Sequence, residues 1–520
     1  MARDYVIGID SGTSVVKAAL FDMQGTEVLV NARNTPVIEE HFGWSEFDMD
    51  TDWNETALCL KELMARAAEK GIYSEDIAAL GVGGKGQGVC LLDRDMCPIR
   101  NAVMWNDTRC VDVKNEWMRP GGVMEQIHSI SGNWLYTGNM ALVMPWMKAH
   151  EKENLDRAVT ISMPTSWLTY QLTGVHKLVR NDVFTLIDGK TREYSEEIFK
   201  IIGMEDYRHL FPDPIDAWEI TGQITADAAE LTGLPAGIPV VNMGWDTICC
   251  TAGVGAIGDG QANIILGTSG VIQLVMPFAP TTPERLGAVC VHAIPGKWCQ
   301  LISPMTGTPN SDWFVKNFTH ADHERAKQEG RSVYALFDEE IANVPLGSNG
   351  VIYHPYLSPT GEMAPFTNTA ARAQFIGLLP HDTRYVMLRA IYEGVALAFR
   401  HCLDAYSFPI SEIRLSGGGS KSAVWCQIFA DVCNAPISLA SGTEFGVKGV
   451  AWNAAWAAGA FETQQEACDA FCAVDRVYTP NPAAVEQYAD LYEVYKAIPP
   501  AMFDIWDKRM AFLKKYGYEG

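Results

Sequence analysis

The sequence is short of positive charge and has no long uncharged apolar run. Its 40 lysine and arginine residues face 63 aspartate and glutamate residues, which gives a formal net charge of −23. Nucleic acids and anionic membranes bind clustered lysine and arginine, so this balance argues against both as the main partner. No apolar run reaches the roughly 18 residues of a transmembrane helix. The first ten residues, MARDYVIGID, lack the apolar core of a signal peptide, and we expect none.

The cysteines also lack a metal-binding pattern. There are 13 of them, an odd number, and none forms a Cys-x-x-Cys pair. This usage predicts reduced thiols in a cytoplasmic protein, most of them serving as small core residues. A chain of 520 residues is too long for one ordinary core, so we expect two or more domains.

A short sequence element occurs twice, about half a chain apart. Near the start, an apolar run ends in Asp10 and is followed by Gly12-Thr13-Ser14 and a second apolar run. In the middle, the stretch 262–266 is followed by Gly267-Thr268-Ser269 and the run 271–275. Each copy predicts a β-hairpin with a Gly-Thr-Ser turn. The repeat predicts two similar halves, residues 1–254 and 255–520, with a junction at the small-residue helix 247–254.

Both turns have the chemistry of a phosphate site. A Gly-Thr-Ser turn presents backbone N–H groups and two hydroxyls to one point, which suits the oxygens of a polyphosphate. A carboxylate beside phosphates is repulsive unless a cation intervenes, so Asp10 implies Mg²⁺. Lys17, on the returning strand, is predicted to reach the phosphates as a point charge, with a solvated edge lysine as the alternative.

A second glycine-rich element follows the predicted strand 413–416. Gly417, Gly418 and Gly419 precede Ser420 and a predicted helix over 422–433. Glycines let the backbone approach a flat ligand, and a helix N-terminus favours anions. We therefore expect adenosine or its α-phosphate to bind here. The alternative is that the glycines only form a tight turn.

Asp246 is the predicted catalytic base. A short buried strand, Pro239 to Met243, is predicted to run through Gly244 and Trp245 to Asp246, directly before the helix 247–254. Ligands of α/β proteins bind at this end of the strands. Phosphoryl transfer needs one carboxylate to accept the proton of the attacking hydroxyl. The alternative is that Asp246 only caps the helix. The same carboxylate is also a predicted ligand of the metal.

Acceptor contacts are expected from the first half of the chain. A glycine-rich loop and a polar–aromatic cluster each follow a predicted strand, and aromatic faces with polar side chains suit a polyhydroxylated ligand. For Asp107 and Arg109 a surface ion pair is the alternative. The predicted acceptor residues are Lys85, Gln87, Trp105, Asp107, Arg109, Trp245 and Asp246.

Together these stretches resemble the FGGY carbohydrate kinases, over nearly the whole chain. "GIDSGTSVVKAALFD" and "LGTSG" resemble the family's two phosphate motifs, and "VMWNDTR" its substrate segment. "GWDTICCTAGVG" resembles the segment that carries the catalytic aspartate, and "RLSGGGSKSAVWCQIFADVCNAPI" the adenosine motif. The resemblance implies an α/β fold of two ribonuclease H-like, actin-like ATPase domains with a central interdomain cleft. It implies ATP and Mg²⁺ as cofactors and, at family level, a homodimer.

The acceptor is left open within the family. "KTREYSEEIFKIIGMEDYRHLFP" resembles the erythritol kinases, and the L-xylulose kinases look similar overall. Gly86-Gln87 stands where xylulose kinases usually have Met-His, which argues against D-xylulose. Two residues, Val143 and Val386, differ from the family's signature sequences. Neither position is expected to contact the phosphates, so these differences concern the choice of acceptor and the local helices and not the type of reaction.

The expected activity is phosphorylation of a terminal hydroxyl of a small polyol or ketose. D-xylulose, ribulose and glycerol remain alternative acceptors. A nucleotide-switched interaction protein of the actin or Hsp70 kind is a second hypothesis, which the acceptor cluster disfavours. A silent sugar sensor is a third, disfavoured because Asp10 and Asp246 are both present.

Overall fold

The computed structural model describes residues 3–281 and 287–518, and these form two compact units. Of the described residues, unit 1 comprises 3–259, 275–281, 287–300 and 441–473, and unit 2 comprises 260–274, 301–440 and 474–518. The division between residues 254 and 255 that the sequence predicts remains a proposal. Two segments that follow it in the sequence, 275–300 and 441–473, pack in unit 1. Among the described residues, no helix combines the length and apolar character needed to cross a membrane.

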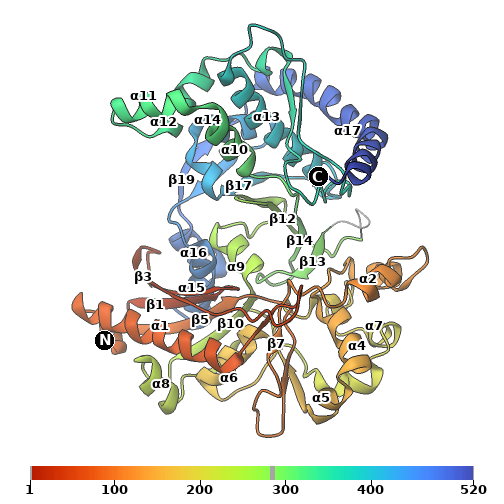
Figure 1. Ribbon diagram of the computed structural model, residues 1–520. Coiled ribbons are helices and arrows are strands. Elements are labelled where there is room, and N and C mark those ends of the chain that lie inside the picture. The colour runs from red at the N-terminus through yellow and green to blue at the C-terminus, as the bar shows by residue number, and fades with distance from the viewer. Residues whose placement is uncertain (1–2, 282–286, 519–520) are drawn as a thin grey trace. The chain divides into compact units, whose positions relative to one another are not determined.

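Unit 1 is built on a six-stranded sheet in the order β3-β2-β1-β5-β10-β9, and Figure 1 labels β3, β1, β5 and β10 of this sheet. Strands β1, β5 and β10 run parallel, whereas β2, β3 and β9 are antiparallel to their neighbours. The strands of this unit are β1 (Tyr5–Ser11), β2 (Val15–Asp22), β3 (Glu27–Asn34), β4 (Glu46–Phe47), β5 (Ile77–Gly84), β6 (Cys90–Leu92), β7 (Ala102–Val103), β8 (Thr160–Ser162), β9 (Ile220–Gln223), β10 (Pro239–Trp245) and β13 (Ala288–Val291).

Side-chain alternation along β1 gives the sheet two buried faces. Ile7 and Ile9 pack in one core with α1 and α6, whereas Val6 packs in another with α9 and α15. The helices of unit 1 are α1 (Met49–Glu69), α2 (Val111–Trp117), α3 (Val123–Ser131), α4 (Met140–His150), α5 (Lys152–Arg157), α6 (Pro164–Thr173), α7 (Glu196–Ile201), α8 (Ala226–Thr232), α9 (Asp246–Gly253), α15 (Phe445–Ala457) and α16 (Gln464–Phe471).

Unit 2 repeats the same order of a hairpin followed by parallel strands. Its strands run β12-β11-β17-β18-β19, with β11, β17 and β18 parallel. The strands are β11 (Gln261–Leu266), β12 (Gly270–Met276), β15 (Ile352–His354), β16 (Gln374–Ile376), β17 (Glu412–Ser416), β18 (Ile437–Ala440) and β19 (Val474–Tyr478), and β14 (Trp298–Ile302), like β12, crosses a unit boundary. The predicted repeat of two hairpins is therefore confirmed.

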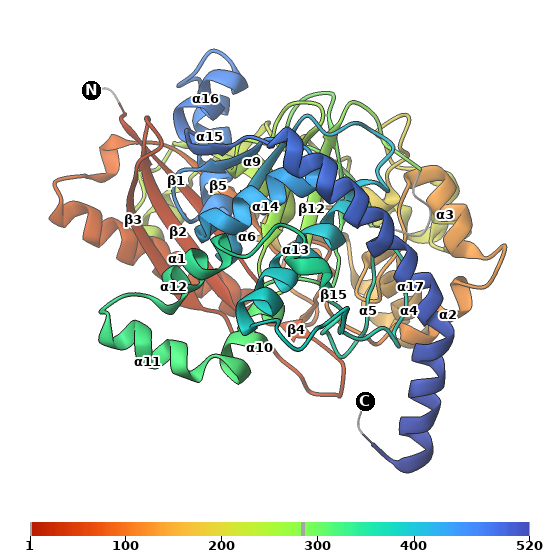
Figure 2. The same cartoon turned by 90° about the horizontal axis from the view of Figure 1, so that it is seen from above.

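Helices α13 and α14 lie side by side in unit 2 (Figure 2). The helices of this unit are α10 (Pro309–Phe318), α11 (His320–Gln328), α12 (Val333–Ala342), α13 (Arg384–Leu403), α14 (Ala423–Cys433) and α17 (Pro482–Tyr516). With two sheets flanked by helices, the predicted α/β class is confirmed.

The small residues of helix α9 allow close packing against another helix, and that helix, α15, lies in the same unit. A Cβ on Gly253 of α9 would come within 1.7 Å of the Phe445 carbonyl oxygen of α15, and a Cβ on Gly449 would come within 2.1 Å of the Cys249 carbonyl oxygen. Side chains at these two positions would push the helices apart. Helix α9 is thus held against segment 441–473 within unit 1 and does not mark where the two units divide.

The sequence pattern over 52–70 predicts a helix with Asp52 as its N-cap. Helix α1 instead begins at Met49, and its N-cap is Asp48, whose carboxylate accepts a hydrogen bond from the Thr51 N–H at 2.7 Å. Asp52 lies one turn inside the helix and is buried. Its Oδ1 accepts a hydrogen bond from Lys85 Nζ at 2.6 Å, and both side chains are 2% exposed.

This buried ion pair anchors the first hairpin to α1. Lys85 Nζ also donates to Ser11 Oγ at 3.0 Å and to the Gly12 carbonyl oxygen at 3.3 Å. The Lys85 N–H donates to the Ser11 carbonyl oxygen at 2.7 Å. The ammonium therefore fixes the end of β1 and the start of the Gly-Thr-Ser turn.

Lys85→Met is expected to lower the free energy of unfolding by about 3–5 kcal/mol, because it leaves Asp52 charged and buried without its partner. The double variant Lys85→Met/Asp52→Leu should recover most of that loss, because it removes both charges. Urea denaturation followed by circular dichroism measures both effects. Equal stability of the single variant and the unsubstituted protein would contradict this role of the pair.

Candidate functional site

The carboxyl ends of three parallel strands bring Asp10 and Asp246 to one edge of the sheet of unit 1. In the strand register Asp10 lies beside Gly83, and Trp245, which precedes Asp246, lies beside Gly84. Only the two glycines of β5 separate the strands that carry the carboxylates. Ligands of parallel α/β sheets bind at this edge.

The Asp10 carboxylate has a buried oxygen that could bind a cation. Its Oδ1 is shielded from solvent and has no hydrogen-bond partner among residues 3–281 and 287–518. Burial raises the pKa of this carboxyl group, and the nearby Lys17 ammonium partly offsets the shift. An unpaired buried carboxylate oxygen is unstable as an anion unless it finds a positive partner.

Asp246 is partly exposed and forms the first residue of α9. Burial of its carboxyl group and, to a smaller extent, the negative charge of Asp10 raise its pKa to about 7. The Thr247 hydroxyl, which donates to Asp246 Oδ1 at 3.2 Å, acts against the shift. A carboxylate that titrates near neutral pH is suited to accept a proton.

The first hairpin has the predicted turn. The Gly12 N–H donates to the Val15 carbonyl oxygen at 2.9 Å and closes the loop between β1 and β2. The hydroxyl of Thr13 accepts a hydrogen bond from Trp105 Nε1 at 3.1 Å. A predicted acceptor residue is therefore in direct contact with a predicted phosphate residue, and Ser14 completes the exposed tip.

The Lys17 side chain has a protein partner. It lies opposite Asp10 in the hairpin register, and its ammonium donates to Glu444 Oε2 at 2.7 Å. The side chain is 39% exposed, so this ion pair is a weak one. The predicted contact with phosphate stays a prediction, and it would require the ammonium to leave or share Glu444.

The second hairpin, in unit 2, carries Gly267 between β11 and β12, with Thr268 and Ser269 exposed. The Gly267 carbonyl oxygen accepts from the Thr308 N–H at 2.8 Å. A Cβ on Gly307 would lie 2.1 Å from that oxygen, so the adjacent backbone is tightly packed. The hydrogen bond from Thr308 fixes the turn, and the exposed hydroxyls of Thr268 and Ser269 can face a ligand.

A pocket of about 550 Å³ lies beside the glycine-rich element of unit 2. Gly418 and Gly419 line it, together with the stacked rings of Tyr392 and Trp425, whose centroids are 4.1 Å apart. Gly417 (φ +90°) packs against Leu266, and the Ser420 hydroxyl donates back to the Gly417 carbonyl oxygen at 2.8 Å. The volume and aromatic walls suit a nucleoside, with Gly417 and Ser420 shaping the loop.

The predicted acceptor residues divide into two groups. Lys85, Asp107 and Arg109 are buried in ion pairs within unit 1. The Arg109 guanidinium donates to Asp107 and Glu46, and it lies 4.0 Å from the centre of the Trp44 ring. These contacts differ from the predicted direct contact with a ligand, because each charged group is already paired inside the protein.

Trp245 directly precedes Asp246, and the loop of Gln87 reaches Trp245, because a Cβ on Gly86 would lie 2.6 Å from Trp245 Cδ1. Gln87 is fully buried, has a positive φ of 63° and accepts a hydrogen bond from Asn139 Nδ2 at 2.7 Å. Backbone strain of this kind is concentrated at functional sites. The Trp245 ring stacks on Phe184 with centroids 5.0 Å apart and is partly exposed.

Sequence reasoning missed a second buried carboxylate, Asp182. Its carbonyl oxygen accepts from the Gln87 amide, and its Oδ2 accepts from the Thr165 hydroxyl at 2.8 Å. Burial and, to a smaller extent, the charge of Asp246 raise the pKa of Asp182 to about 7, against the hydrogen bond from Thr165. The pair Asn181-Asp182, which together with Arg180 interrupts the apolar residues of 178–187, was the available signal.

Asn181, the other member of that pair, holds the strand that leads to Asp246. Its Nδ2 donates to the Met243 carbonyl oxygen at 2.8 Å, and its Oδ1 accepts from the Trp245 N–H at 3.3 Å. Gly244 must be glycine here, because its φ is +75° and a Cβ would lie 2.0 Å from Asn181 Oδ1.

Comparison with known proteins agrees with this geometry. Residues 5–253 match the FGGY family of carbohydrate kinases, N-terminal domain, and residues 262–458 match its C-terminal domain. The chain is 31% identical to the erythritol kinase of Brucella abortus, over 97% of this chain and 98% of that protein. It is 29% identical to a probable L-xylulose kinase of Pasteurella multocida, over 96% and 99%.

A solved structure shows the same fold. The xylulose kinase from Rhodospirillum rubrum superposes with a TM-score of 0.85 at 28% identity and covers 97% of this chain and 100% of that one. The predicted ribonuclease H-like, actin-like ATPase fold of the two domains is confirmed. With both domains of one family matched in order along its length, the chain belongs to the FGGY carbohydrate kinases, which transfer phosphate from ATP to a sugar or polyol.

Proposed function

We propose that the protein phosphorylates a terminal hydroxyl of a small polyol or ketose, of the erythritol or L-xylulose type, with Asp246 as general base. The observation that supports this most is the pair of carboxylates, Asp10 and Asp246, at one sheet edge. One has an unpaired buried oxygen, and the other has a pKa of about 7. The names of the similar kinases support the acceptor class.

The reaction follows from these positions. The Asp246 carboxylate accepts the proton of the acceptor hydroxyl, and the resulting oxygen attacks the γ-phosphorus of ATP. The bond from that phosphorus to the bridging oxygen breaks, and ADP leaves. The hydroxyls and backbone N–H groups of the turns at 12–14 and 267–269 bind phosphate oxygens, with Lys17 adding a positive charge. The loop 417–420 binds adenosine.

Mg²⁺ fits the residues at the sheet edge. Asp10 Oδ1 and the Asp246 carboxylate would hold it, directly or through water. Mg²⁺ in kinases takes only one or two carboxylates and completes its shell with water and phosphate oxygens. Consistently, no group of three or more His, Cys, Asp or Glu side chains forms a metal site in the part of the chain that the structure describes. When bound, the ion neutralises phosphate charge.

The acceptor would lie near Gln87, Trp105 and Trp245. The partly exposed Trp105 and Trp245 rings offer faces for the carbon chain of a polyol, while Gln87 positions the loop through Asp182 and Asn139. Lys85, Asp107 and Arg109 act as positioning residues behind them. D-xylulose, ribulose and glycerol are the alternative acceptors.

Asp246→Asn is expected to reduce kcat by about 10²–10⁴-fold, because the hydroxyl loses its proton acceptor. ATP binding, measured by calorimetry, should stay within a few-fold of the original. Asp227→Asn, the same change at an exposed position of α8, is the control and should leave kcat unchanged. A kcat for Asp246→Asn close to that of the control would remove Asp246 from the mechanism.

The acceptor class is tested by coupled ADP release over tetritols, pentitols, ketopentoses and glycerol. We expect the highest kcat/KM with erythritol or L-xylulose. Highest kcat/KM with D-xylulose, ribulose or glycerol would replace the proposed acceptor by that compound. ATP hydrolysis that no compound in the panel stimulates, together with nucleotide-dependent assembly, would favour a nucleotide switch instead.

A further inference from the structure

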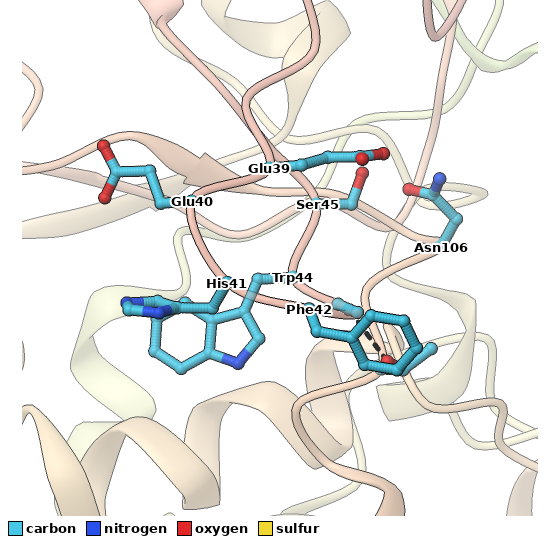
Figure 3. Close-up of a pocket in the computed structure, with 9 residues that line it drawn as sticks. Glu39, Glu40, His41, Phe42, Trp44, Ser45 and Asn106 are labelled. Atoms are coloured by element: carbon cyan, nitrogen blue, oxygen red, sulfur yellow. Dashed lines mark hydrogen bonds between the residues drawn. The ribbon is translucent and has the colours of Figure 1, made fainter.

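A second pocket in unit 1 lies on the loop between β3 and β4. It has a volume of about 280 Å³ and is lined by residues 39–45, Asn106 and Thr108 (Figure 3). Asn106 belongs to the polar–aromatic cluster from which acceptor contacts are expected, but the lining includes none of the predicted catalytic or phosphate-binding residues. Residues 39–45, which form most of the lining, lie outside the predicted site.

The loop that forms this pocket is held in place. The N–H and the hydroxyl of Thr108 both donate to the Gly43 carbonyl oxygen at 2.8 Å. A Cβ on Gly43, whose φ is +79°, would lie 2.2 Å from Thr108 Oγ1. Below the loop, Trp44 packs edge-on against His41 and stacks under the Arg109 guanidinium. The pocket wall is built on this fixed framework.

One polar group in the pocket is left without a partner. Ser45 is only 4% exposed, and its Oγ has no hydrogen-bond partner among the residues that the structure describes. Buried hydroxyls are normally hydrogen-bonded, and an exception calls for an explanation. Figure 3 shows the Glu39 carboxylate and the Asn106 carboxamide pointing toward this hydroxyl, whereas Glu40 points away.

These groups identify the chemistry of the ligand. A carboxylate accepts hydrogen bonds, a carboxamide donates and accepts, and a hydroxyl does both, which together match adjacent hydroxyl groups. Phe42, which is fully exposed at 106%, offers an aromatic face for the carbon chain. Neither lysine nor arginine is among the lining residues, so an anion has no positive partner here.

We propose that this pocket is a second binding site for a neutral polyhydroxylated molecule, with Glu39, Ser45 and Asn106 binding its hydroxyls. The volume of about 280 Å³ lies just below the usual range of ligand pockets, about 300–1,000 Å³, and suits a single small sugar or short polyol. The pocket is also connected by a hydrogen bond to Asp107, one of the predicted acceptor residues. The Ser45 N–H donates to Asp107 Oδ2 at 2.7 Å, and Asp107 is paired with Arg109.

The test counts binding sites for erythritol and for xylitol on the full chain without nucleotide, by equilibrium dialysis with labelled polyol. Glu39→Gln and Ser45→Ala should each bind one polyol fewer per chain than the unsubstituted protein. Glu40→Gln makes the same charge change on a side chain that points away and should keep every site. Circular dichroism and melting temperature confirm that each variant is folded.

An unchanged number of sites in both Glu39→Gln and Ser45→Ala would overturn the proposal. Binding of Ca²⁺ or Mg²⁺ that Glu39→Gln abolishes, without loss of a polyol site, would overturn it in favour of a cation. The outcome is independent of the proposed acceptor site, because polyol bound near Asp246 contributes equally to all the variants. If nothing bound near Asp246, the unsubstituted protein would show one site, which Glu39→Gln would remove.

Discussion

The burial of two carboxylates, Asp10 and Asp246, at one edge of a sheet is the constraint on which the account of this kinase depends. Two strands that flank β5 end beside each other, and each brings a carboxylate to the same edge. Burial alone disfavours both charges, and the charge of Asp10 further raises the pKa of Asp246. The protein tolerates such an arrangement where its ligand supplies the missing positive charge, as a metal–nucleotide complex does. Burial, with a smaller contribution from the charge of Asp10, makes Asp246 basic enough to accept a proton near neutral pH.

The surrounding structure holds these carboxylates in a fixed geometry. Lys85 ties the start of the first turn to α1 through Asp52, and Asn181 clamps the strand end that leads to Asp246. Glycines at positions 83 and 84 keep the strand between them free of side chains, and Gly449 lets α15 approach α9 closely behind it. None of these residues needs to touch a ligand. They restrict where the reacting groups can move, which is what phosphoryl transfer chiefly requires.

Local patterns in the sequence predicted the hairpins and the strand end at Asp246, because each is specified by a few consecutive residues. The Gly-Thr-Ser turns and the helix after Asp246 belong to this class. Long-range pairings were not predictable in the same way. Nothing near Lys85 indicates that its partner is Asp52, 33 residues earlier on a helix face. Asp182 comes next to Gln87 only through tertiary packing, and segment 441–473 carries no local sign that it returns to unit 1.

The most direct test of the carboxylate pair is a ¹³C NMR titration of the Asp246 carboxyl group in metal-free protein, with and without Asp10→Asn. We expect Asp246 to titrate near pH 7 and its pKa to fall clearly in the variant, because the charge of Asp10 contributes to the shift. A midpoint near the ordinary aspartate value of about 3.9 in both proteins would contradict the account.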